Sequence, residues 1–249
     1  MKKLISKLFS VLGLEIYKKR PKKNIVFTAD QPPCYIELIG VSGVGKSSFY
    51  QKLLKDQKRF WTIQDFKNSI PKVDINYLTD GSSFYQKLAK EQWQYIQKLN
   101  ILETDKLRMT HWNYKTLTED ALISKFNKNS IVLSDEGILH NFQNSLLKIQ
   151  ESHPAELKEF LKNRAVIYCF ADKEKIVNQI IQRQNETGRI VSHHKSKTKE
   201  ELLKLVEKEL NEKEEFLKFI ELEGVRVLRV NMQDNPTINH LKIKEYLKL

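Results

Sequence analysis

Eight consecutive residues of the chain have the spacing of a phosphate-binding loop (P-loop). Residues 40–47 read Gly-Val-Ser-Gly-Val-Gly-Lys-Ser, which matches the pattern Gly-x-x-x-x-Gly-Lys-Ser/Thr in full. The glycines permit a tight turn whose backbone N–H groups point inward at phosphate oxygens. A helix that follows adds its own free N–H groups and the positive end of its dipole. The segment is therefore predicted to hold the phosphates of a nucleoside triphosphate.

Two residues of this loop have specific predicted roles. Lys46 should reach the β- and γ-phosphates, and the hydroxyl of Ser47 should ligate Mg²⁺. The chain contains no Asn-Lys-x-Asp run for guanine recognition, so ATP is favoured over GTP as the cofactor. The predicted nucleotide-binding set is Gly40, Ser42, Gly43, Val44, Gly45, Lys46, Ser47 and Ser48.

A P-loop protein also needs an acidic group near the magnesium ion, at the end of a neighbouring strand. Asp135 directly follows the apolar run 131–133, which is typical of a buried strand. The carboxyl ends of parallel strands lie at one edge of the sheet, where the loop also lies. We therefore predict that Asp135 anchors the metal. Glu136 shares this work, as a ligand through water or as the base; an acidic turn that caps the next helix is the alternative for both residues.

The elements that must position these residues alternate along the chain between strand-like and helix-like patterns. This alternation predicts an α/β fold, a three-layer sandwich with a five-stranded, mainly parallel sheet flanked by helices. The helices are expected to begin near Ser152 with Pro154, Asp172, Thr198 with Glu201, and Pro236. The predicted strands are 35–39, 60–63, 131–133, 165–170 and 225–230.

Residues 1–24 carry much of the positive charge of the chain. The net charge is +12, and this segment contributes eight basic residues against Glu15 alone. Its apolar residues recur at helical spacing, which predicts an amphipathic leader helix too short to span a bilayer. The leader either docks on the domain's own core or lies on an anionic membrane surface, with a flexible arm as the third reading.

Two cysteines, Cys34 and Cys169, form no disulfide framework and resemble no metal site. Both stand in apolar runs, so they are predicted to be buried thiols. Free thiols favour a reducing cytoplasm. The predicted localisation is therefore cytoplasmic. If residues 1–24 lie on a membrane, the protein would be peripheral at the inner membrane surface.

A second basic motif, Arg183-Gln-Asn-Glu-Thr-Gly-Arg189, follows the fourth predicted strand and its helix. With this motif and the P-loop, residues 34–232 resemble the nucleoside and nucleotide kinase branch of P-loop proteins, which includes thymidylate kinase. The resemblance implies one kinase domain over 34–249 with a lid at about 183–197. In such a lid Arg183 and Arg189 would clamp the transferring phosphoryl group, because a guanidinium offsets charge in the transition state.

The chain departs from this family after the third strand, where the relatives often carry Asp-Arg and this chain has Asp135-Glu136-Gly137. The family's substrate contacts therefore cannot be transferred. Asp65 lies in the region where a substrate-contacting base or acid would sit in relatives. It is predicted to act as a general base, and a role as a helix cap or turn residue is an equal alternative. Segment 82–115 falls where relatives build the acceptor pocket. The alternative is that its aromatic residues pack in the core between helices. The segment contains Tyr85, Trp93, Tyr95, Arg108, His111 and Trp112.

The expected activity is in-line transfer of the γ-phosphoryl group of ATP to a small-molecule acceptor, a nucleoside, nucleotide or sugar-type hydroxyl or phosphate. Three alternatives remain open at this stage. One is a regulatory or GTPase-like NTPase, and another is a nucleic-acid end kinase or nucleic-acid-stimulated ATPase. The third is a membrane-surface kinase acting on a lipid-linked or polysaccharide precursor.

Overall fold

The computed structural model describes residues 34–56, 60–70, 83–126, 130–188, 194 and 197–247. Its centre is a five-stranded sheet in the order β2-β3-β1-β4-β5, in which every neighbouring pair is parallel. The predicted α/β class and strand number are thus confirmed. The leader prediction for residues 1–24 lies outside the described residues. The strands are β1 (Tyr35–Ile39), β2 (Phe60–Trp61), β3 (Ile131–Ser134), β4 (Arg164–Phe170) and β5 (Arg226–Asn231).

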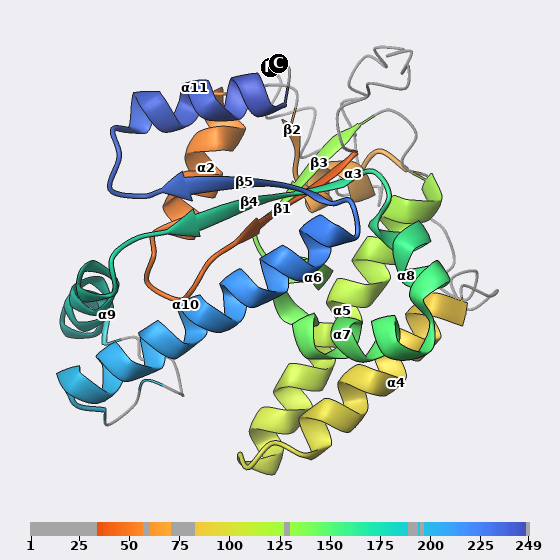
Figure 1. Ribbon diagram of the computed structural model, residues 1–249, viewed down its shortest axis with the longest axis horizontal. Coiled ribbons are helices and arrows are strands. Elements are labelled where there is room, and N and C mark those ends of the chain that lie inside the picture. Colours follow the sequence, from red (N-terminus) through yellow and green to blue (C-terminus); the bar gives the residue numbers. More distant parts are fainter. Residues whose placement is uncertain are drawn as a thin grey trace, which may run out of the picture.

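Helices cover both faces of the sheet (Figure 1). One layer contains α2 and α11, and the other contains α10 together with the group α4 to α8. None of the described helices is both long and apolar enough to cross a membrane. The helices are α2 (Lys46–Asp56), α3 (Ile63–Lys67), α4 (Ser83–Gln97), α5 (Glu103–Phe126), α6 (Ile138–Asn141), α7 (Gln143–Ser152), α8 (Pro154–Leu161), α9 (Lys173–Thr187), α10 (Lys199–Leu222) and α11 (Pro236–Tyr246).

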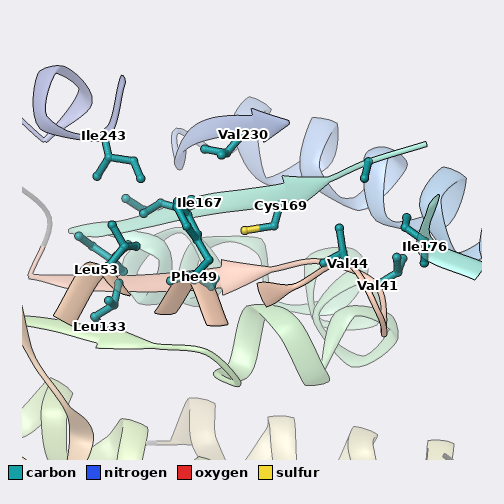
Figure 2. Packing of buried hydrophobic residues seen from close by; sticks show 14 of the residues in the cluster. Val41, Val44, Phe49, Leu53, Leu133, Ile167, Cys169, Ile176, Val230 and Ile243 are labelled. Carbon is teal, nitrogen blue, oxygen red and sulfur yellow. The ribbon is translucent and has the colours of Figure 1, made fainter. Parts of the chain in front are cut away.

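The inner strands β3, β1 and β4 are almost entirely buried, as strands covered by helices on both faces are. In β1, Ile36 and Leu38 point into the core under α2 and α11, while Ile39 joins the core on the opposite face. Figure 2 shows the first of these cores, in which side chains of α2 and α11 pack on β3, β4 and β5. Cys169 belongs to this core as predicted, whereas Cys34 is only partly buried.

The bounds of β3, β4 and β5 differ from the sequence-based expectation by one residue, and at two further boundaries a residue has another role than expected. The predicted strand 60–63 stops at Trp61, because the Thr62 hydroxyl accepts a hydrogen bond from the Asp65 N–H at 2.9 Å and starts α3. Ser152 is not a helix cap but the last residue of α7, and α8 begins after His153. By contrast, the predicted capping box of Thr198 with Glu201 is present at the start of α10.

Candidate active site

The P-loop leaves β1 at Gly40 and enters α2 at Lys46, which is the strand–loop–helix context that its sequence requires. Gly43 and Gly45 have φ angles of 89° and 92°, a conformation that side chains disfavour. A Cβ on Gly43 would also lie 2.6 Å from Cγ1 of Ile180 in α9. Glycine is therefore required at this position both by the backbone turn and by the close approach of α9.

The start of α2 offers the groups that bind phosphate. Backbone N–H groups in the first turn of a helix have no intrahelical partner, and here they belong to Lys46, Ser47 and Ser48. The side chains of Ser47 and Ser48 are exposed, so a ligand can reach this turn. The loop and helix start together form a site for a polyphosphate.

Lys46 joins the P-loop to the end of β3, at the carboxyl edge of the sheet where the sequence predicts that both lie. Its ammonium group donates a hydrogen bond to the main-chain carbonyl of Asp135. Burial lowers the pKa of Lys46, and the nearby carboxylates of Glu136 and Asp135 act against that shift. The structure thus brings one cation and two carboxylates together at the carboxyl edge of the sheet.

This arrangement fits a magnesium ion that is shared with a nucleotide. Among the described residues no cluster of three or more His, Cys, Asp or Glu side chains could hold a metal ion by itself. Mg²⁺ usually binds one or two protein oxygens and completes its shell with phosphate oxygens and water. The exposed hydroxyl of Ser47 and the carboxylates of Asp135 and Glu136 are hard oxygen donors of the kind that such an ion prefers.

Glu37 is a site residue that the sequence reasoning missed. It is fully buried in the middle of β1, and its carboxylate accepts a hydrogen bond from the backbone N–H of His140 at 3.2 Å. The short helix α6 begins after Gly137, which provides no side-chain cap. Glu37 therefore takes the place of the missing cap and ties α6 to the strand that carries the P-loop.

Glu37 belongs to a buried polar network. Arg164 in β4 donates two hydrogen bonds to the carboxylate of Asp120 in α5, at 2.8 and 2.6 Å, and lies 3.5 Å from Oε1 of Glu37. The hydroxyl of Tyr85 donates to the same Asp120 at 2.6 Å. Burial raises the pKa of Glu37 to about 7, and Arg164 opposes that shift. This network connects α4 and α5 to the neighbouring strands β1 and β4.

Replacing Gly137 by alanine is expected to destabilise this part of the site. A Cβ there would lie 2.2 Å from Oε2 of Glu37, and the carboxylate cannot move away without losing its bonds to α6 and Arg164. Overpacking of a buried site costs about 1–3 kcal/mol in unfolding free energy. Urea denaturation measures the loss. Gly188→Ala is the control, because a Cβ at Gly188 would have no atom within 4 Å. Its φ of 63° gives this variant a backbone strain that Gly137→Ala lacks. Equal stability of Gly137→Ala and the natural chain would contradict the tight packing.

A cavity of about 330 Å³ adjoins the first residues of the P-loop, Gly40 to Ser42. Its other walls come from four helices, α4, α6, α7 and α10. On the α10 side, Lys213 donates a hydrogen bond to Oε1 of Gln143 at 3.1 Å. Burial lowers the pKa of Lys213 to about 8, with Glu209 acting in the opposite direction. The cavity therefore places a partly desolvated ammonium group beside the nucleotide site.

His140 lines the same cavity from α6. Burial, followed by the charges of Lys46 and Lys213, lowers its pKa well below the ordinary range, so the imidazole is neutral near pH 7. Its Nδ1 atom is buried and has no hydrogen-bond partner within the described part of the chain. Sequence reasoning passed over both His140 and Lys213, because neither belongs to a recognisable motif.

Only part of the predicted acceptor segment 82–115 reaches this cavity. Tyr95 lines it, and Tyr85 instead belongs to the buried network. Trp93 and Trp112 are 47% and 44% exposed, so the core reading is wrong for them, and neither lines this cavity. Their part in an acceptor site stays a prediction. Arg108 and His111 are exposed as well.

Arg183 lies against the P-loop, as the kinase resemblance implies. Its Nη2 atom donates to the hydroxyl of Ser42 at 3.4 Å. However, residues 183–187 are the last turn of α9, which ends at Gly188, so a lid could begin only beyond that glycine. The predicted partner Arg189 lies outside the described residues.

Asp65 has the structural role that was one of its two predicted readings. It is the third residue of the capping box of α3, where its carboxylate accepts from the backbone N–H of Thr62 at 3.2 Å. The general-base reading stays a prediction, and the site described above does not depend on it.

No protein-family model matches the chain, and no curated protein matches its sequence. Similar solved structures include shikimate kinase from Bacteroides thetaiotaomicron, 11% identical with a TM-score of 0.45, over 86% of this chain and 98% of that one. Deoxyadenosine kinase from M. mycoides with bound dCTP is 14% identical with a TM-score of 0.44, over 86% and 98%. The same enzyme with bound dATP is 14% identical with a TM-score of 0.45, over 86% of this chain and 100% of that one. By its own sheet order and loop, the chain has the fold of a P-loop α/β protein.

Proposed function

We propose that the chain is an ATP-dependent kinase that transfers the γ-phosphoryl group to a small molecule held in the cavity beside the P-loop. The observation that carries this proposal is the shared wall: residues Gly40 to Ser42 belong both to the loop and to the cavity. An acceptor there would meet the terminal phosphate of a nucleotide bound to α2. An NTPase that only hydrolyses its nucleotide would not need such a cavity.

In this reaction the protein positions its reactants and neutralises charge. The N–H groups at the start of α2 hold the phosphates, and Lys46 reaches the β- and γ-phosphates from the same turn. The chemistry that Mg²⁺ would supply when bound is neutralisation of charge on the phosphates. Ser47 and Asp135 would hold the ion, with Glu136 acting through water or as the base for the acceptor hydroxyl.

Arg183 completes the donor site from α9, and Arg189 stays the predicted second clamp. The bond from the acceptor oxygen to phosphorus forms as the bond to ADP breaks, and charge spreads over the equatorial oxygens. A guanidinium beside Ser42 can contact those oxygens in a forked geometry. Little covalent chemistry is then left to the protein, because holding the reactants in line supplies much of the rate.

Acceptor-dependent release of ADP from MgATP tests the proposal. The acceptor panel comprises sugars, nucleosides and nucleoside monophosphates. The release of ADP is measured with each acceptor and without any acceptor. Release that depends on one class of acceptor supports a kinase. ATP hydrolysis at the same rate with every acceptor would overturn the proposal in favour of an NTPase.

Arg183→Gln is expected to lower kcat by about 10–10²-fold, because it removes one charge-assisted contact worth about 1.5–3 kcal/mol. The measurement is kcat for ADP release under saturating MgATP and acceptor. Gln182→Ala is the matched control, since Gln182 is the exposed neighbour on the same helix. If both variants kept full kcat, Arg183 would have no part in the reaction.

A further inference from the structure

The side chains that line the cavity beyond the P-loop are all polar. Most small-molecule sites are mainly apolar, with a few polar groups that fix orientation. Here amides line two walls, from α4 and α7 with Gln92, Gln143 and Asn144 among them, and the aromatic rings of the lining are those of Tyr95 and His140. Outside the P-loop, the described lining offers a nucleobase no aliphatic side chain to pack on, whereas amides exchange hydrogen bonds with hydroxyl groups as both donors and acceptors.

The charges of the lining also select the ligand. Outside the P-loop they are the carboxylates of Glu209 and Glu212 and the ammonium group of Lys213, since His140 is neutral. Lys213 is already engaged with Gln143. An acceptor that carries a phosphate or carboxylate would bring a further negative charge next to two carboxylates, which is unfavourable in a partly desolvated site.

The polar walls are held in place before a ligand arrives. The carbonyl oxygen of the buried Gln92 amide accepts from the Ser145 hydroxyl at 2.7 Å, and its nitrogen lies 3.5 Å from the Asn141 carbonyl. Gln143 is held by Lys213 and donates to the Leu139 carbonyl at 3.2 Å. Each amide keeps further hydrogen-bonding capacity, and such fixed groups bind a ligand with little loss of entropy.

We infer that the acceptor is an uncharged, hydroxyl-rich small molecule of the monosaccharide or cyclitol type, with hydroxyls hydrogen-bonded by Glu209 and by the amides of α4 and α7. The inference rests on the proposed function, because it names the substrate class of the same cavity. The cavity volume of about 330 Å³ is at the small end of ligand sites, which suits one such ring. One hydroxyl would then face the P-loop.

Ligand binding by saturation-transfer NMR tests this without depending on turnover. The full chain is loaded with Mg²⁺ and a non-hydrolysable ATP analogue, and the probes are glucose, mannose, mannitol, myo-inositol, thymidine and thymidine monophosphate. We expect binding of at least one of the four polyols and none of thymidine monophosphate. Binding of thymidine or its monophosphate alone, or of no probe, would overturn the inference.

Two variants locate the bound polyol. Glu209→Gln is expected to weaken its binding by about 10–10²-fold, since it removes a hydrogen bond to a charged group. Asn144→Ala, at an exposed wall residue, should weaken the binding of the polyol several-fold. Glu215→Gln, at an exposed residue of the same helix α10 outside the lining, is the matched control. Unchanged affinity in both Glu209→Gln and Asn144→Ala would place the polyol elsewhere and overturn the inference.

The phosphoryl-transfer assay separates this inference from the proposed function. A polyol that binds in the cavity but is never phosphorylated would uphold the ligand class and overturn the kinase. Phosphorylation of thymidine monophosphate alone would uphold the kinase and overturn the ligand class.

Discussion

Replacing Lys46 by alanine is expected to lower phosphoryl transfer by on the order of 10²–10³-fold or more, as for the loss of a preorganised charge contact. Lys46 lies in the first turn of α2 and reaches the end of β3, so it occupies the junction of the phosphate site and the predicted metal site. Its pKa is lowered by burial, and desolvation strengthens its attraction to phosphate. No other side chain of that turn carries a positive charge.

The measurement is kcat/KM for the acceptor with MgATP, for the natural chain and the variant. Lys52→Ala is the matched control, because Lys52 is an exposed lysine on the same helix. Its activity should stay within a factor of about two, since exposed substitutions away from special features have small effects. Full activity of Lys46→Ala would mean that the donor site lies elsewhere.

Replacing Arg164 by methionine is expected to lower the free energy of unfolding by about 3–5 kcal/mol, the typical cost of removing one partner from a buried ion pair. The variant would leave the carboxylates of Asp120 and Glu37 buried without their cation. It would also remove a guanidinium that lies 3.8 Å from the centre of the Phe160 ring. Urea denaturation at pH 7 measures the difference.

Arg229→Met is the control for this variant. Arg229 also contacts two carboxylates, Glu214 and Glu221, but all three side chains are about one-third exposed. Its loss should cost at most about 1 kcal/mol, because solvent screens such pairs. Adding Asp120→Leu to Arg164→Met should recover part of the stability, since one of the two carboxylates left without a cation is then removed. Similar losses for the two arginine variants would contradict a special role of the buried network.

The phosphate-binding half of the site can be predicted from the sequence because its information is local. The loop, the strand before it and the helix after it are contiguous over 35–56, and each has its own pattern. The position of Asp135 beside the P-loop follows from one further rule, that parallel strands share their carboxyl edge. Local capping signals also located the starts of α9, α10 and α11.

The acceptor half cannot be predicted in the same way, because three stretches far apart in the sequence meet there: α4, the adjacent pair α6 and α7, and α10. Lys213 has the sequence surroundings of a solvated lysine, and only the packing of α10 against α7 turns it inward. Trp93 and Trp112 show the converse, since large aromatic residues at helical spacing remained exposed. Glu37 did leave a signal, a carboxylate inside the apolar strand Tyr35–Ile39, which required a buried partner.

The most direct test of the central claim follows the γ-phosphate itself. The full chain is incubated with Mg²⁺ and ATP labelled in its γ-phosphate, with and without each acceptor of the panel, and the products are separated. The account predicts that the label moves to an acceptor, that transfer needs Mg²⁺, and that Lys46→Ala nearly abolishes it. Label that appears only as inorganic phosphate, at a rate that no acceptor changes, would contradict a kinase with its acceptor in the cavity beside the P-loop.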